Sequence, residues 1–135
     1  MIVEDDLDDC DFIETALNEI GVKNEIKCFR NGQEALDYLQ GTSEKTFLIV
    51  SDVNMPIVNG FELKRAINKD NKLRLQAIPF IFLSTTEQPR EVDKGYDLMV
   101  QGFFQKPNTF DEIKQLLTTV TNYWRTALHP KGIVS

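Results

Sequence analysis

The chain has 135 residues, of which 41% are hydrophobic and 27% are charged, and this is ordinary for one globular domain with its own core. Its net charge of −6 at pH 7 argues against a nucleic-acid-binding surface, which needs a basic patch. No apolar run is long enough to cross a bilayer, and the acidic start MIVEDDLDD is unlike a signal peptide. These features predict a cytoplasmic protein that binds neither nucleic acid nor membrane.

The first half of the chain alternates strand and helix patterns. The apolar run at 1–3 predicts a short strand, and the apolar spacing over 8–21 predicts a helix with an acidic first turn that ends at Gly21. Residues 25–29 alternate charged and apolar side chains, which is typical of an edge strand. Residues 31–41 then predict a short helix.

The alternation continues through the middle of the chain. Residues 46–51 are nearly all apolar, which predicts a strand that is buried on both faces. Residues 61–69 predict a helix, and residues 78–84 predict a second fully apolar strand. We expect these two apolar strands at the centre of a sheet and 25–29 at its edge.

The last third of the chain repeats the pattern. Residues 102–105 predict a short strand, and residues 109–128 predict a long helix with a capping box of Thr109 and Glu112. Residues 90–100 predict the helix before them. Its apolar side is expected to consist of Val92, Tyr96, Met99 and Val100. Five strands that alternate with five helices predict an α/β fold with a parallel sheet and right-handed crossovers.

Three single-residue predictions concern the cysteines and the histidine. Cys10 and Cys28 have no C-x-x-C spacing and are too few for a disulfide framework, so we expect both to be reduced interior residues. His129 lies in the final segment, and we expect it to be solvated.

Polar residues follow four of the five expected strands. In an open parallel sheet the carboxyl ends of the strands meet at one edge, where ligands bind, so we expect these residues to converge on one crevice. They are Glu4, Asp5 and Asp6 after the first strand, Asp52 after the third, Ser84, Thr85 and Thr86 after the fourth, and Lys106 after the fifth.

Each group also has an ordinary structural explanation. Acidic residues favour a helix N-terminus, Asp52 suits a turn, Ser84 can cap a helix, and Lys106 can be a solvated surface charge. Their joint occurrence at the ends of four strands favours a shared site.

The chemistry of the set is coherent. Clustered carboxylates repel one another, and a hard divalent cation such as Mg²⁺, which prefers oxygen ligands, relieves that repulsion. An aspartate beside such an ion can accept a phosphoryl group. Lys106 and the Ser84 hydroxyl can then stabilise the charge on the phosphoryl oxygens.

These residues, in this order, resemble a response-regulator receiver domain, the phosphoacceptor module of bacterial two-component signalling. The resemblance rests on IVEDD, on the D-x-x-M-P-x-x-x-G run DVNMPIVNG, on IPFIFLSTT and on GFFQKP, and it covers essentially the whole chain. It implies a flavodoxin-like (βα)5 three-layer sandwich with sheet order 2-1-3-4-5. The domain would occupy residues 1–128, with a C-terminal tail at 129–135.

The resemblance also implies a role for each residue that takes part in the chemistry. Asp52 is the expected phosphoacceptor and Lys106 the expected phosphate-binding lysine. Ser84 is the expected switch hydroxyl and Phe103 the expected switch aromatic. Because Phe103 replaces the frequent tyrosine, we expect the outward hydrogen bond of that tyrosine to be lost.

The implied metal site uses the acid pair. Glu4, Asp5 and Asp52 are expected to bind Mg²⁺ together with the backbone carbonyl of Asn54, while the role of Asp6 stays open. Three neighbours are expected to modulate the phosphorylation chemistry: Asn54, Thr85 and Thr86.

The finer pattern narrows the subgroup. The segments DDLDD, GQEALDYL, GYDLMVQGFFQKP and NYWRTAL are similar to stand-alone receivers of the cyanobacterial phytochrome-partner type. The implied partners are a sensor histidine kinase or a histidine phosphotransfer protein and an unknown downstream protein. The implied signalling surface is formed by the fourth helix, the fifth strand and the fifth helix, through which homodimers also form in the family.

Three alternatives stay open. The protein could be a phosphorelay intermediate that passes the phosphoryl group to a histidine phosphotransfer protein. It could be a phosphatase of the haloacid-dehalogenase type, although Asn54 stands where that class needs a second acid. It could also be a binding module that has lost phosphorylation. We expect no enzyme activity beyond self-phosphorylation from small donors and autodephosphorylation.

Overall fold

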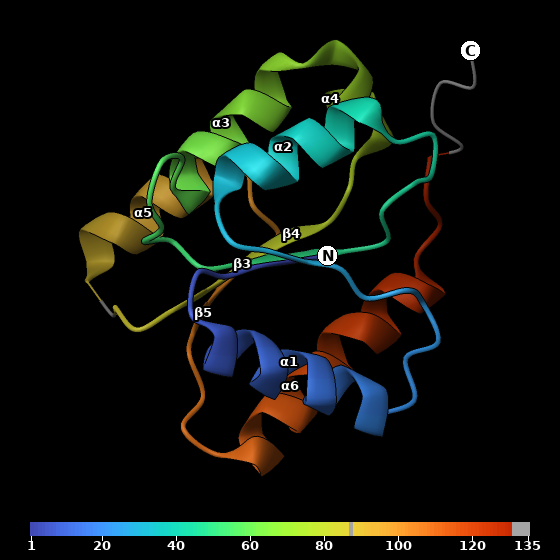
Figure 1. The fold of residues 1–135 in the computed structure, drawn as a ribbon, viewed down its shortest axis with the longest axis vertical. Helices are drawn as coiled ribbons and strands as arrows, with labels where there is room; N and C mark the ends of the chain where they lie inside the picture. The colour runs from blue at the N-terminus through green and yellow to red at the C-terminus, as the bar shows by residue number, and fades with distance from the viewer. Residues whose placement is uncertain (87, 131–135) are drawn as a thin grey trace.

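Five parallel strands form one sheet at the centre of the molecule. The computed structural model describes residues 1–86 and 88–130 (Figure 1). The strand order is β2-β1-β3-β4-β5, which confirms the predicted flavodoxin-like sheet and places the apolar strands β3 and β4 inside it. The strands are β1 (Ile2–Val3), β2 (Cys28–Phe29), β3 (Ile49–Ser51), β4 (Phe80–Ser84) and β5 (Gly102–Gln105).

Helices cover both faces of the sheet. On one face lie α1 (Leu7–Glu19) and α6 (Phe110–Thr126). On the other lie α2 (Gly32–Gly41), α3 (Gly60–Lys69), α4 (Asn71–Gln76) and α5 (Pro89–Asp97), as Figure 1 shows. Among the described residues, no helix is both long enough and apolar enough to cross a membrane.

The central strands build a core on each face. Successive side chains of a strand point to opposite faces, so β4 sends Phe80 and Phe82 toward α3 and α5, and Ile81 and Leu83 toward α1 and α6. All five residues of β4 are buried. This double burial explains why the strand is a continuous apolar run and why a polar residue appears only where it ends.

The helix α4 was not predicted. Asp70 ends α3 and caps α4, because its side chain accepts a hydrogen bond from the N–H of Leu73 at 3.0 Å. Leu73 is the one buried residue of this helix, so the sequence shows no helical periodicity there. The fourth and fifth predicted helices are therefore α5 and α6.

The predicted apolar side of α5 is wrong in part. The helix ends at Asp97, and the side chains of Tyr96 and Met99 are 50% and 73% exposed. Its buried residue is Gly95, where a Cβ would lie 2.7 Å from Cδ2 of Phe103. The helix thus faces the sheet with a glycine, because an aromatic ring fills the space that a side chain would need.

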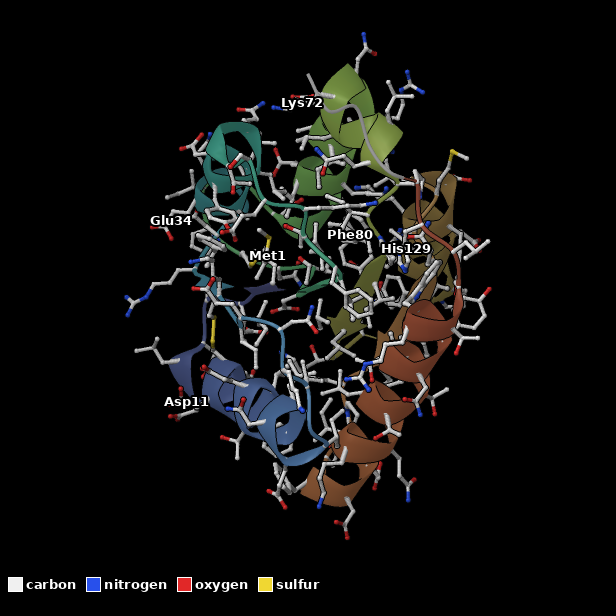
Figure 2. All side chains as sticks on the ribbon, turned by 90° about the vertical axis from the view of Figure 1, so that its right-hand side faces the viewer. Met1, Asp11, Glu34, Lys72, Phe80 and His129 are labelled. Atoms are coloured by element: carbon white, nitrogen blue, oxygen red, sulfur yellow. A yellow bond between two sulfur atoms is a disulfide. The ribbon has the colours of Figure 1, made fainter. Side chains whose placement is uncertain are left out.

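The prediction that Cys10 and Cys28 are reduced is also wrong. The structure joins them by a disulfide between α1 and β2, visible as a yellow bond in Figure 2. The two residues are 18 positions apart and pack in the same core. Local spacing could not show this pairing, since it depends on α1 folding back beside β2.

His129 is half-buried, so the prediction that it is solvated is wrong. Its ring centroid lies 5.7 Å from that of Phe47 and 6.0 Å from that of Trp124 (Figure 2 labels it). Of the tail predicted at 129–135, residues 131–135 lie outside the described residues.

Candidate functional site

Three of the predicted site residues meet at the carboxyl edge of the sheet. Glu4 follows β1, Asp52 follows β3 and Lys106 follows β5. The Lys106 Nζ donates a hydrogen bond to Oε2 of Glu4 at 2.9 Å and lies 3.8 Å from Oδ2 of Asp52. Parallel strands bring these residues together although they are far apart in the sequence.

Glu4, Asp5 and Asp52 form a cluster of carboxylates. Each offers one oxygen atom, and the three atoms all lie within 4.8 Å of one another. Glu4 is only 2% exposed, Asp52 is half-buried and Asp5 is exposed. Within the described residues no hydrogen bond engages the backbone carbonyl of Asn54. A set of oxygen donors open to solvent on one side fits Mg²⁺, which keeps several waters when it binds.

Burial governs the charges of this cluster. Burial raises the pKa of Glu4 to about 7, even though the hydrogen bond from Lys106 opposes the shift. Burial likewise raises the pKa of Asp52 above its ordinary value, and the charge of Lys106 opposes that shift. Burial alone would lower the pKa of Lys106, but its hydrogen bonds to Glu4 and Asp9 outweigh burial and raise it. Fully ionised carboxylates are therefore costly here unless a cation accompanies them.

The loop after β3 holds the Asp52 side chain in place. The N–H of Val53 donates to Oδ1 of Asp52 at 2.7 Å. At the other end of the loop, Asn59 and Glu62 form a capping box that begins α3. A Cβ on Gly60 would lie 2.2 Å from the carbonyl oxygen of Asp52, so only glycine lets α3 begin this close to the site.

Among the described residues, no hydrogen bond joins the hydroxyl residues at the end of β4 to Asp52. Ser84 is fully buried, and its Oγ accepts a hydrogen bond from the N–H of Thr86 at 3.2 Å. Its backbone carbonyl accepts from the N–H of Lys106 at 2.7 Å, which ties the ends of β4 and β5 together. Thr85 is exposed and Thr86 is half-buried. In the described part of the chain, no hydrogen bond joins the Ser84 hydroxyl to Asp52 or to the Lys106 side chain.

Phe103 connects β5 with α5. Its ring centroid lies 5.6 Å from that of Phe82, and its ring also contacts Gly95. Its N–H donates to the hydroxyl of Tyr96 at 3.2 Å. The sequence predicted that no tyrosine hydroxyl would form a hydrogen bond at position 103, because Phe103 replaces the frequent tyrosine. The hydroxyl of Tyr96 in α5 instead bonds to the backbone of β5 there. Sequence reasoning missed this role because it assigned Tyr96 to the core.

Asp9 is a second residue that sequence reasoning missed. Its Oδ2 accepts a hydrogen bond from Nζ of Lys106 at 2.9 Å. Asp6, whose role was open, is the N-cap of α1 and accepts from the N–H groups of Asp8 and Asp9 at 2.9 Å and 3.2 Å. A cavity of about 460 Å³ opens beside Lys106, between α1 and the loop that follows β5.

Comparison with known proteins assigns the family. A parallel sheet in the order 2-1-3-4-5, with carboxylates and a lysine at its carboxyl edge, defines the class of two-component receivers. Residues 1–118 match the family model for the response regulator receiver domain. The chain belongs to this family.

Individual relatives agree with that assignment. The probable methanogenesis regulatory protein FilR2 of Methanothrix harundinacea is 28% identical over 128 residues, which cover 92% of this chain and 81% of FilR2. The probable transcriptional regulator ycf29 of Pyropia yezoensis is 35% identical over 90% of this chain, which spans about half (51%) of that protein. The phosphorylated cyanobacterial phytochrome response regulator RcpA has a TM-score of 0.85 and 29% identity over 96% of both chains. The likeness to receivers of the phytochrome-partner type is thereby confirmed.

Proposed function

We propose that this protein accepts a phosphoryl group on Asp52 from a phosphohistidine of a sensor histidine kinase or a histidine phosphotransfer protein. One observation carries the proposal: the Asp52 carboxylate stands at the carboxyl edge of the sheet, beside two further carboxylates and 3.8 Å from the Lys106 ammonium. The structure of RcpA, a phosphorylated relative of the same fold, supports it. In this role the chain is a signalling protein rather than a catalyst that turns over a substrate.

The transfer step follows from the two oxygens of Asp52. Oδ1 accepts the hydrogen bond from Val53, whereas Oδ2 faces Lys106. Oδ2 is therefore the attacking atom: an O–P bond forms, the N–P bond of the phosphohistidine breaks, and its electron pair returns to the imidazole. Lys106 lies where it can balance the charge on the phosphoryl oxygens.

Glu4, Asp5 and Asp52 would hold Mg²⁺ together with the Asn54 carbonyl. The bound ion would supply positive charge that neutralises both the carboxylates and the incoming phosphoryl group. Asn54, two residues after Asp52, and Thr86, two residues after Ser84, would influence how fast water removes the phosphate. The exposed Thr85 lines the cavity beside Lys106.

The signal would leave through α5, β5 and α6. Phosphorylation adds roughly 1.5 to 2 negative charges, which would draw Lys106 and the Ser84 hydroxyl toward Asp52. Displacement of Ser84 would change the packing of Phe103. Because Phe103 contacts Gly95 and bonds to Tyr96, its movement would reach α5 directly. A downstream protein or a second copy of this chain would bind the altered surface.

The test is an intact-mass measurement after incubation with acetyl phosphate and Mg²⁺. We expect one phosphoryl group on the wild-type protein and none on Asp52→Asn. An equal mass gain in both proteins, or a gain in neither, would contradict the proposal. Turnover of p-nitrophenyl phosphate would instead indicate a phosphatase, and no feature of the described residues favours that alternative or the phosphorelay one.

A further inference from the structure

We infer that Asp9 is a positioning residue that holds the Lys106 ammonium for the phosphoryl transfer, an inference that rests on the function proposed above. The Lys106 Nζ donates to Oδ2 of Asp9 and to Oε2 of Glu4, at 2.9 Å in both cases. Its distance to Oδ2 of Asp52 is longer, at 3.8 Å. Lys106 is thus hydrogen-bonded to two acids, while the carboxylate of Asp52 lies beyond hydrogen-bond distance of its ammonium.

The number of N–H donors on the Lys106 ammonium limits how many oxygen atoms it can bind. A lysine ammonium has three N–H donors and no acceptor. Two donors are engaged by Glu4 and Asp9, so the third is left for another acceptor. The distance of 3.8 Å from Nζ to Oδ2 of Asp52 is too long for a hydrogen bond, so the third N–H stays available to an oxygen of a phosphoryl group carried on Asp52.

Asp9 differs from Glu4 in its relation to the proposed metal site. Glu4 belongs to the carboxylate cluster with Asp5 and Asp52, whereas Asp9 does not. A metal ion in that cluster would compete with Lys106 for Glu4, and Asp9 would remain the anchor of the ammonium. Without an anchor, the long side chain of Lys106 would lose its fixed orientation, since a free lysine carries about 2 kcal/mol of rotamer entropy.

The position of Asp9 is itself well fixed. Its N–H donates to Oδ1 of Asp6, the N-cap of α1, at 3.2 Å. The next residue, Cys10, is joined to Cys28 of β2 by the disulfide. Asp8 belongs to the same helical turn and forms no ion pair with Lys106, so it provides a matched control.

The first experiment compares rates of phosphorylation by acetyl phosphate. We expect Asp9→Ala to lower the maximal rate roughly tenfold, the factor that corresponds to one charge-assisted hydrogen bond. The Mg²⁺ concentration for half-maximal rate should stay unchanged, because Asp9 lies outside the metal cluster. Asp9→Glu should restore part of the rate, and Asp8→Ala should match the wild type. A wild-type rate in Asp9→Ala overturns the inference.

A double-mutant cycle tests whether Asp9 acts through Lys106. In the Lys106→Ala background, the further change Asp9→Ala should have no effect on the rate. A second tenfold fall in that background would show that Asp9 acts by another route, and would overturn the inference.

A measurement on the unphosphorylated protein tests the role of Asp9 independently of the proposed function. If the wild type takes up no phosphoryl group, the proposed function fails, and the ion pair is then judged by ¹⁵N NMR of the Lys106 ammonium. We expect a signal protected from hydrogen exchange in the wild type and lost in Asp9→Ala. An unprotected signal in the wild type overturns the role of Asp9 whatever the phosphorylation result.

Discussion

Glu4 should make the stability of the metal-free protein depend on pH. Its pKa is raised by burial from 4.5 to about 7, so ionising it costs more in the folded chain than in the unfolded one. A raised pKa gives stability that is fully present below about 4.5 and is lost as the pH rises to about 7. The pKa of Asp52 is raised in the same direction and adds to the loss.

We expect Glu4→Gln to remove most of this pH dependence. The difference in free energy of unfolding between the variant and the wild type should grow by on the order of 3 kcal/mol across that pH window. Urea unfolding in the presence of EDTA, at the two ends of the window, measures it. A constant difference between the two proteins would show that Glu4 ionises as easily in the fold as in the unfolded chain.

At the residue scale, the sequence predicted the groups that follow strands. Glu4, Asp52 and Lys106 each follow a strand, and a parallel sheet brings the ends of its strands together. Asp9 could not be selected in the same way, because it is one of several acids around the start of α1. Which of these acids faces Lys106 depends on how α1 is rotated about its axis, and this is a property of the packing.

At the element scale, the start of α3 depends on Gly60. A Cβ there would lie 2.2 Å from the Asp52 carbonyl oxygen and 2.7 Å from Cε1 of Phe82. One contact is with backbone and the other with a fully buried ring, so neither can give way without moving the loop that carries Asp52. We expect Gly60→Ala to lower the free energy of unfolding by about 3 kcal/mol.

Gly41, at the end of α2, is the matched control. Its Cβ would meet no atom within 4 Å, so Gly41→Ala should leave the stability unchanged or raise it slightly. Urea unfolding of the two variants beside the wild type measures both effects. Equal stability of the two variants would contradict the close approach at Gly60.

The disulfide joins two elements and should stabilise their contact. It closes a loop between positions 18 apart, for which the chain-entropy model gives about 3 kcal/mol. We expect a dithiol reductant to lower the free energy of unfolding of the wild type by about that amount. The double variant Cys10→Ala and Cys28→Ala should be insensitive to the reductant. A wild type equally insensitive to it would show that the bond does not contribute.

The five strands and five of the helices were predictable, whereas α4 and the inner face of α5 were not. The helices α1 and α6 have apolar stripes that fix both their existence and their inner face. The helix α4 buries one residue, so no apolar periodicity marks it, and α5 turns a glycine toward the sheet, so its apolar residues do not show its inner face. The disulfide could not be predicted from the local sequence either, because it joins elements that meet only after α1 has packed on the sheet.

At the scale of the whole molecule, binding of a metal ion should raise the thermal stability of the protein. An ion that binds the folded state alone raises the free energy of unfolding by about 2.7 kcal/mol at a hundred times its dissociation constant. For a domain of this size that corresponds to roughly 10 °C of melting temperature. We expect saturating Mg²⁺ to raise the melting temperature of the wild type by that amount.

Two variants show whether the shift in melting temperature comes from binding at a specific site or from general screening of charge. Asp5→Asn removes a member of the carboxylate cluster and should abolish most of the shift. Asp8→Asn removes an exposed acid outside the cluster and should retain it. An equal shift in both variants would mean that Mg²⁺ acts on the net charge of −6 rather than at the cluster.

The central claim is that Asp52 itself carries the phosphoryl group, and chemical mapping of the modified residue tests it most directly. Borohydride reduces an aspartyl phosphate to homoserine, which peptide mass spectrometry then locates in the chain. After treatment with acetyl phosphate and Mg²⁺, we predict homoserine at position 52 and at no other aspartate. Homoserine at Asp5 or Asp9, or an unmodified Asp52 in a protein that has gained a phosphoryl group, would contradict the claim.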